Sequence, residues 1–159
     1  MTTSVKPIPD GYTAVTPYLI VDGCAEALEF YKKAFGAEEI MRLPMPDGSK
    51  IMHAEIQIGG ARIMMADSNP EWGAKSPKEF GGSPVSIHLY TEDADALFNQ
   101  AVAAGAEAVM PVAEMFWGDR HGRVADPFGH AWSVSTHVSD PTPEEMQAGF
   151  EKAMAEGSD

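Results

Sequence analysis

Cationic residues are scarce in this chain. Among 159 residues there are 11 lysines and arginines against 24 aspartates and glutamates, which gives a formal net charge of −13. Nucleic-acid binding depends largely on cationic contacts to phosphates, and anionic membrane surfaces attract basic segments. The balance therefore argues against a nucleic-acid or membrane partner. Two interpretations of the charge remain: plain solubility, or long-range attraction of a cationic ligand.

Cysteine and long apolar runs are also nearly absent. A single cysteine, Cys24, excludes an internal disulfide and is typical of a reducing compartment. No run approaches the roughly 20 apolar residues of a membrane helix. The first residues lack the apolar stretch of a secretory signal. We therefore expect a cytoplasmic protein, and the chain length predicts a single domain.

What the chain does contain is an internal repeat. The segment 30–39 (FYKKAFGAEE) returns as 98–107 (FNQAVAAGAE). Each copy follows a short apolar run and an acidic residue, Asp22 in the first and Asp93 in the second. Two copies of one unit in a short chain usually stack into one body. The repeat predicts two similar modules with a cleft between them.

Local patterns predict the elements of each module. In the first, Asp22 can cap a helix that ends at Gly36. The predicted elements are a strand over 13–21, a helix over 23–35 and strands over 38–43, 51–58 and 62–66. The second module repeats this order, with a strand over 85–91, a helix over 93–104 and strands over 107–110, 117–125 and 131–136. The fold class is α+β, with two tandem βαβββ modules whose eight strands form an open, barrel-like sheet around a cleft.

The remaining segments suggest the organisation of the chain. The loop between the modules is long, which is typical either of a lid or binding segment or of a surface linker with docked aromatics. The predicted parts are a flexible N-terminal arm (1–11), one domain (12–140) and a C-terminal helix with a tail (141–159). Within the domain, module one spans 12–67, the connecting loop 68–83 and module two 84–138.

The C-terminal helix carries a start signal and an apolar stripe. Thr142 and Glu145 have the spacing of a capping box. Met146, Phe150 and Met154 lie on one side of the helix. The stripe packs either on the chain's own sheet or on a second chain. Because symmetric dimers are the commonest assembly, we expect a homodimer.

The modules resemble the vicinal oxygen chelate superfamily, which includes glyoxalase I, extradiol dioxygenases, fosfomycin-resistance enzymes, methylmalonyl-CoA epimerase and bleomycin-binding proteins. The resemblance is closest to its PhnB-like branch and covers residues 12–138. Five segments carry it: 16–21 (TPYLIV), 53–55 (HAE), 117–120 (WGDR), 126–132 (DPFGHAW) and 136–137 (TH). The resemblance implies the fold and a small-molecule site, but no particular reaction, because one fold can host several chemistries.

The resemblance also shows where metal ligands would stand. In the metal enzymes of this superfamily they occupy equivalent places in both modules, which correspond here to Thr16, Met64, Ser86 and Ser133. Transition metals in such sites favour imidazole, carboxylate or thiolate ligands. None of the four residues supplies one. We therefore expect neither the standard metal nor another cofactor.

Strand alternation predicts which side chains line the cleft instead. The predicted catalytic residues are His53, Glu55 and His88, and the predicted ligand-binding residues are Tyr18, Arg62, Met64, Tyr90, Trp117 and Arg120. Imidazole and carboxylate groups can perform general acid–base chemistry. Two simpler alternatives remain: His53 and Glu55 line a solvated strand face, and Arg120 forms a structural ion pair with Asp119 or Asp126.

The leading functional hypothesis is a metal-free small-molecule-binding protein of the PhnB-like branch, which the sequence leaves open as enzyme or binder. One alternative is a metal-dependent lyase or isomerase with His53, Glu55 and His88 as shifted ligands. Another is a drug-sequestering resistance protein, for which the net charge of −13 would favour a cationic drug.

Overall fold

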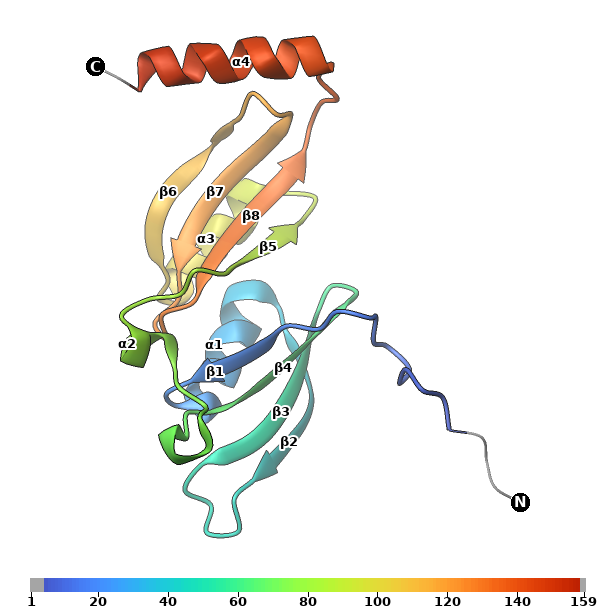
Figure 1. The fold of residues 1–159 in the computed structure, drawn as a ribbon, viewed down its shortest axis with the longest axis vertical. Helices are drawn as coiled ribbons and strands as arrows, with labels where there is room; N and C mark the ends of the chain where they lie inside the picture. Colours follow the sequence, from blue (N-terminus) through green and yellow to red (C-terminus); the bar gives the residue numbers. More distant parts are fainter. Residues whose placement is uncertain (1–4, 158–159) are drawn as a thin grey trace. The chain divides into compact units, whose positions relative to one another are not determined.

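The computed structural model of this chain describes residues 5–157, and these form two compact units. Unit one comprises residues 1–83 and unit two residues 84–159. Each contains one four-stranded mixed sheet with a helix packed on it (Figure 1). Over residues 5–157, no helix has the length and apolar character needed to cross a membrane.

Unit one follows the predicted βαβββ order. Its elements are β1 (Tyr18–Val21), α1 (Cys24–Phe35), β2 (Glu38–Pro44), β3 (Ile51–Ile58) and β4 (Ala61–Asp67). The sheet order is β1-β4-β3-β2, with β1 parallel to β4 and the other neighbours antiparallel. The parallel pair requires a long crossover, and α1 lies within it.

The core of unit one lies between α1 and one face of the sheet. Leu28 and Tyr31 of α1 are fully buried, as are Ala54 and Ile56 of β3. Side chains alternate along a strand, so the residues between these positions in β3 face the opposite side and remain half-buried. This alternation creates the polar face on which the predicted site residues stand.

The cap of α1 differs from the prediction. Asp22 makes no side-chain cap, and the N-cap residue is Gly23 in a left-handed conformation. The carboxylate of Asp67, at the end of β4, instead accepts hydrogen bonds from the backbone N–H groups of Gly23 (3.0 Å) and Cys24 (2.8 Å). The prediction was wrong because a residue distant in sequence supplies the acceptor.

The segment that joins the units contains two short helices. These are the 3₁₀ helix η1 (Pro70–Trp72) and α2 (Pro77–Phe80). Ser68 and Glu79 tie the segment together through a 2.6 Å hydrogen bond. The side chains of Trp72 and Phe80 are 63% and 70% exposed, so neither aromatic docks deeply on a core.

Unit two repeats the order and adds a helix. Its elements are β5 (Ser86–Tyr90), α3 (Ala94–Ala104), β6 (Glu107–Glu114), β7 (Asp119–Ala125), β8 (Ala131–His137) and α4 (Pro143–Glu156). The sheet order is β5-β8-β7-β6, with β5 parallel to β8. Trp132, Val124 and Val134 are fully buried in its core. Asp93 caps α3 as predicted, accepting from the N–H of Ala96.

The α+β prediction with two tandem βαβββ modules is confirmed. The eight strands are divided between two four-stranded sheets, and within residues 5–157 neither closes into a barrel. The first strand begins at Tyr18 rather than residue 13. The strand β6 runs on to Glu114, past an irregular register around Pro111, which cannot donate a backbone hydrogen bond.

Residues 5–11 and the helix α4 are not buried. Residues 1–4 of the predicted arm and 158–159 of the predicted tail lie outside the described residues. The predicted capping box at Thr142 and Glu145 is present at the start of α4. None of the α4 residues is buried, although Phe150 contacts Phe116 with ring centroids 5.9 Å apart.

Candidate functional site

Three predicted residues meet on the polar face of unit one. Tyr18 of β1 pairs with Met64 of β4, and Met64 pairs in turn with Glu55 of β3. The Tyr18 hydroxyl lies 2.9 Å from Nδ1 of His53, and His53 Nε2 lies 3.1 Å from Oε1 of Glu55. The structure thus joins Tyr18, His53 and Glu55 in one hydrogen-bonded series.

The ionisation of Glu55 determines which group donates in each of these hydrogen bonds. The pKa of the Glu55 carboxyl is lowered, first by the neighbouring Tyr12 hydroxyl and then by His53, against the opposing effect of burial. An ionised carboxylate can only accept, so His53 Nε2 carries a hydrogen, and in the neutral imidazole Nδ1 is then an acceptor. Tyr18 therefore donates its hydroxyl hydrogen to His53. The oxygen of Tyr18 keeps its lone pairs for a ligand.

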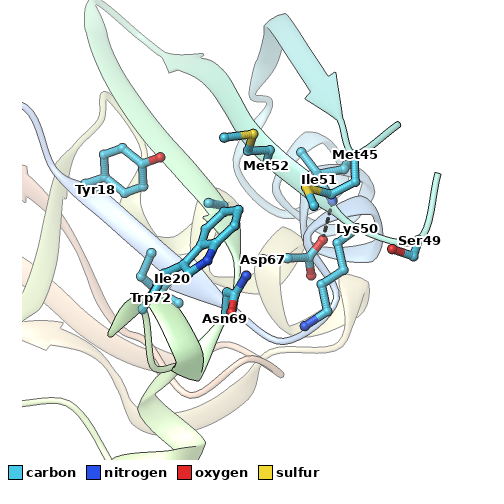
Figure 2. A pocket seen from close by; sticks show the side chains of 12 residues that line it. Tyr18, Ile20, Met45, Ser49, Lys50, Ile51, Met52, Asp67, Asn69 and Trp72 are labelled. Carbon is cyan, nitrogen blue, oxygen red and sulfur yellow. Dashed lines mark hydrogen bonds between the residues drawn. The ribbon is translucent and has the colours of Figure 1, made fainter. Parts of the chain in front are cut away.

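A pocket adjoins Tyr18 on this same unit. It has a volume of about 300 Å³ and is mostly apolar. Figure 2 shows Tyr18 on one side, Met52 and Trp72 between, and Lys50 with Ser49 on the other side. Ile20, Met45 and Ala66 also line it. The segment between the units was expected to be either a binding segment or a surface linker, and Trp72 does line the pocket, whereas most of the other lining residues were not predicted.

The polar groups at the far side of the pocket are already paired. Lys50 Nζ donates to the carbonyl of Ser68 at 2.6 Å. The Asp67 carboxylate accepts from the N–H of Ile51 at 2.7 Å as well as from the start of α1. These contacts fix the wall, so the pocket is largely pre-formed. Tyr18 is its polar group nearest the His53–Glu55 pair.

A second polar cluster lies on the sheet of unit two. Nδ1 of His88 on β5 forms a 3.0 Å hydrogen bond with the hydroxyl of Ser133. His121 of β7 pairs with Ser135 at 2.8 Å, and the rings of His88 and His121 stack with centroids 5.5 Å apart. The pKa of His121 is lowered by burial first and by His88 second. These effects favour the neutral imidazole of His121.

Asp119 organises the rest of this cluster. It is buried and receives hydrogen bonds from the Tyr90 hydroxyl (3.1 Å) and from His137 Nδ1 (2.8 Å). Burial alone would raise the pKa of Asp119, but His137 and Tyr90 outweigh it and lower the pKa. Trp117 stands edge-on to His121 at 5.5 Å. Two predicted residues, Tyr90 and Trp117, thus lie around His121 and Asp119.

His121 is the residue that sequence reasoning missed, although a signal existed. Trp117 was expected to line the site, and alternation gives Asp119 and His121 the same parity. The sheet registers show which residues of the two units are equivalent. Met64 pairs with Glu55 in unit one, and Ser133 pairs with Arg123 in unit two. His53 lies two residues before Glu55 and His121 two residues before Arg123, so the two histidines occupy equivalent positions. The internal repeat could therefore have identified His121 from His53.

The other predicted residues divide as follows. Met64 lies on the polar face of unit one between Tyr18 and Glu55, and Arg62 lies two residues earlier on that strand. Arg120 faces α3, where it forms two 2.8 Å hydrogen bonds to Asp95. The structural ion pair expected for Arg120 exists, but Asp119 and Asp126 were the wrong partners. That the two clusters share one cleft stays a prediction.

The residues present do not fit the metal centre typical of this fold. Met64 pairs with Tyr18, and Ser133 pairs with His88, so the equivalence of the two ligand positions holds. Methionine and serine do not replace the imidazole or carboxylate ligands of such centres. Within residues 5–157, no group of three or more His, Cys, Asp or Glu side chains is arranged to hold a metal ion. Both ring nitrogens of His53 already have partners.

Comparisons with known proteins found similar chains and a matching family model. The protein Rv0887c of Mycobacterium tuberculosis is 47% identical over 138 residues, covering 85% of this chain and 81% of the relative. A structure of an Arabidopsis thaliana gene product (AT5G48480) is 31% identical with a TM-score of 0.64, covering 78% of this chain and 98% of its own.

The PhnB protein of Bacillus cereus shares the fold at 19% identity and a TM-score of 0.60, over 78% of this chain and 99% of its own. A family model of the glyoxalase/bleomycin resistance protein/dioxygenase superfamily matches residues 11–134. The repeated βαβββ units, their equivalent registers and this match together lead to one assignment: the chain belongs to the glyoxalase/bleomycin resistance protein/dioxygenase superfamily.

Proposed function

We propose that this protein is a PhnB-like member of its superfamily that binds a small, largely apolar molecule on the sheet of unit one, without the standard metal. The observation that carries the proposal is the position of Tyr18. Its side chain lines the 300 Å³ pocket and also ends the series through His53 to Glu55. Ligand pockets typically combine apolar walls with a few fixed polar groups.

The series gives the pocket an acid–base capability. The free lone pairs of Tyr18 can accept a hydrogen bond from a ligand hydroxyl. A proton taken up there can pass along to His53, whose protonated form the Glu55 carboxylate would stabilise. The pKa of Tyr18 itself is raised, chiefly by burial, so its hydroxyl stays neutral at physiological pH. The ligand class that suits this site is a planar or branched apolar compound with an acidic hydroxyl group.

Binding of 2-naphthol tests the proposal, followed through the indole N–H resonances in proton–nitrogen NMR. Trp72 lines the pocket, whereas Trp132 is fully buried in unit two and serves as an internal reference. We expect a saturable shift at Trp72 and none at Trp132. Tyr18→Phe should weaken binding about fivefold, the equivalent of one lost hydrogen bond worth ~1 kcal/mol. Equal shifts at both indoles, or no saturation, would contradict the pocket assignment.

A second candidate function is sequestration of a cationic drug, favoured by the net charge of −13. Attraction of this kind weakens as salt screens the charges. The test is binding of the cationic glycopeptide bleomycin at low and high salt. Affinity that falls steeply with salt supports this candidate, and binding undetectable at low salt eliminates it.

A further inference from the structure

Arg62 has an unusual environment for a charged residue. Its Nε and Nη1 atoms are buried and have no hydrogen-bond partner, and among residues 5–157 no carboxylate lies within 4.0 Å of the guanidinium. Buried hydrogen-bond donors normally have a partner, because a donor removed from water has lost its hydrogen bonds to solvent. Arg62 is half-buried and the Glu55 carboxylate is near enough for the two charges to interact, yet Nε and Nη1 still lack an acceptor among the described residues, which a molecule from outside the chain could provide.

The aromatic ring next to Arg62 does not provide a hydrogen-bond acceptor for these donors. The guanidinium carbon of Arg62 lies 5.7 Å from the ring centroid of Tyr12, which allows a cation–π interaction. That interaction leaves the Nε and Nη1 donors without an acceptor among residues 5–157. The hydroxyl of Tyr12 is buried and does not meet full hydrogen-bond geometry with any partner in the described part of the chain. Burial is the main cause that raises the pKa of Tyr12 to about 12, and the neighbouring Glu55 is the second cause. The unpaired donors of this pair are therefore Nε and Nη1 of Arg62, since the Tyr12 hydroxyl has Glu55 beside it.

A small cavity opens beside Arg62. It has a volume of about 120 Å³, well above the roughly 10–15 Å³ that one water molecule requires. Its walls include Thr13, Thr16 and Gly60. The cavity shares no lining residue with the 300 Å³ pocket next to Tyr18.

Gly11 closes the cavity against the guanidinium. Its φ is +84°, and a Cβ atom added there would stand 2.9 Å from Nη2 and 3.0 Å from Nε of Arg62. Any larger residue would press on the charged group and fill part of the space. The absence of a side chain at position 11 thus keeps this space beside Nη2 and Nε of Arg62 open.

We propose that this cavity binds a small carboxylate anion through the guanidinium of Arg62. A guanidinium presents planar donors that match a carboxylate. The nearby Glu55 and the net charge of −13 favour a monoanion over a phosphate dianion, because each added negative charge is repelled. The Thr16 hydroxyl at the wall can donate a further hydrogen bond to the anion, whereas the Thr13 hydroxyl already donates to the carbonyl of Val15 at 3.0 Å. This site stands independently of the function proposed above.

Titration of the full chain with sodium formate tests the proposal, with sodium chloride at equal ionic strength as the control. The readouts are the Nε–H resonance of Arg62 in proton–nitrogen NMR and the melting temperature. We expect formate to shift the resonance saturably and to raise the melting temperature, and chloride to do neither. Arg62→Met should abolish the rise in melting temperature. Arg42→Met is the matched control, since Arg42 already pairs with both oxygens of Glu39.

Three results would overturn the proposal: a chloride effect equal to that of formate, a formate response that survives in Arg62→Met, or binding of inorganic phosphate without binding of formate. If Arg62→Met fails to fold, Gly11→Ala replaces it, because the added methyl group crowds the guanidinium and leaves its charge in place. We expect this variant to weaken the formate response at least about tenfold, by steric exclusion alone. An unchanged response in Gly11→Ala would place the anion elsewhere and refute the site.

Discussion

Replacement of Asp67 by asparagine should destabilise unit one well beyond an ordinary surface substitution. The Asp67 carboxylate joins three elements: Oδ1 accepts from the N–H groups of Gly23 and Cys24 at the start of α1, and Oδ2 accepts from Ile51 of β3 at 2.7 Å. Asparagine has nearly the same shape but only one acceptor oxygen. Its amide NH₂ must then face at least one of these N–H donors.

The size of the effect follows from these contacts. Ile51 is 6% exposed, so its N–H would be left unpaired away from water if the asparagine oxygen stays on α1. A buried donor without a partner costs about 1–3 kcal/mol. Loss of a negative charge at a helix N-terminus adds about 0.3–1 kcal/mol. We therefore expect Asp67→Asn to lower the free energy of unfolding by about 2–4 kcal/mol.

Urea denaturation followed by circular dichroism measures this change, with the midpoint and slope analysed together. Asp22→Asn is the matched control, because Asp22 is exposed and makes no cap, and its cost should stay within about 0.5 kcal/mol. A cost below about 1 kcal/mol for Asp67→Asn, or equal costs for both variants, would refute the reasoning that Asp67 is the cap of α1.

Three further predictions concern metal, pH and assembly. Protein purified without chelator should hold far less than one equivalent of transition metal, and chelator should leave its melting temperature unchanged; a stoichiometric metal would contradict this. The hydrogen bond to Asp119 is the main cause that raises the pKa of His137, and the hydrogen bond to Asp140 is the second. The contribution of His137 to the stability of the fold is therefore fully present below pH 6.5 and is lost as the pH rises through the raised pKa. The stability loss in His137→Asn should accordingly be larger at about pH 5.5 than at about pH 9, and a pH-independent loss would count against the pair. Light scattering should give twice the 17.1 kDa of one chain, with Phe150→Glu on the exposed stripe of α4 shifting the mass toward a monomer; a monomeric wild type would eliminate the dimer.

The sequence by itself determined the order of the main helices and strands and the polar face of the sheet in unit one. Helix periodicity, capping residues and strand alternation act between neighbours in the chain, so 51–58 was predicted with its observed bounds. The same alternation brought His53 and Glu55 to one face, which the structure shows within hydrogen-bonding distance. The repeat anchored the equivalence of Met64 and Ser133, which the registers bear out.

Only the tertiary structure decided which distant residues meet. The cap of α1 comes from Asp67 and the partner of Arg120 is Asp95, because a pairing between separate elements depends on how they pack and not on spacing in the chain. Trp72 reaches the pocket from the connecting segment for the same reason. The unpaired donors of Arg62 became visible only once burial was known, since sequence reports that a residue is charged but not whether water or a partner reaches it.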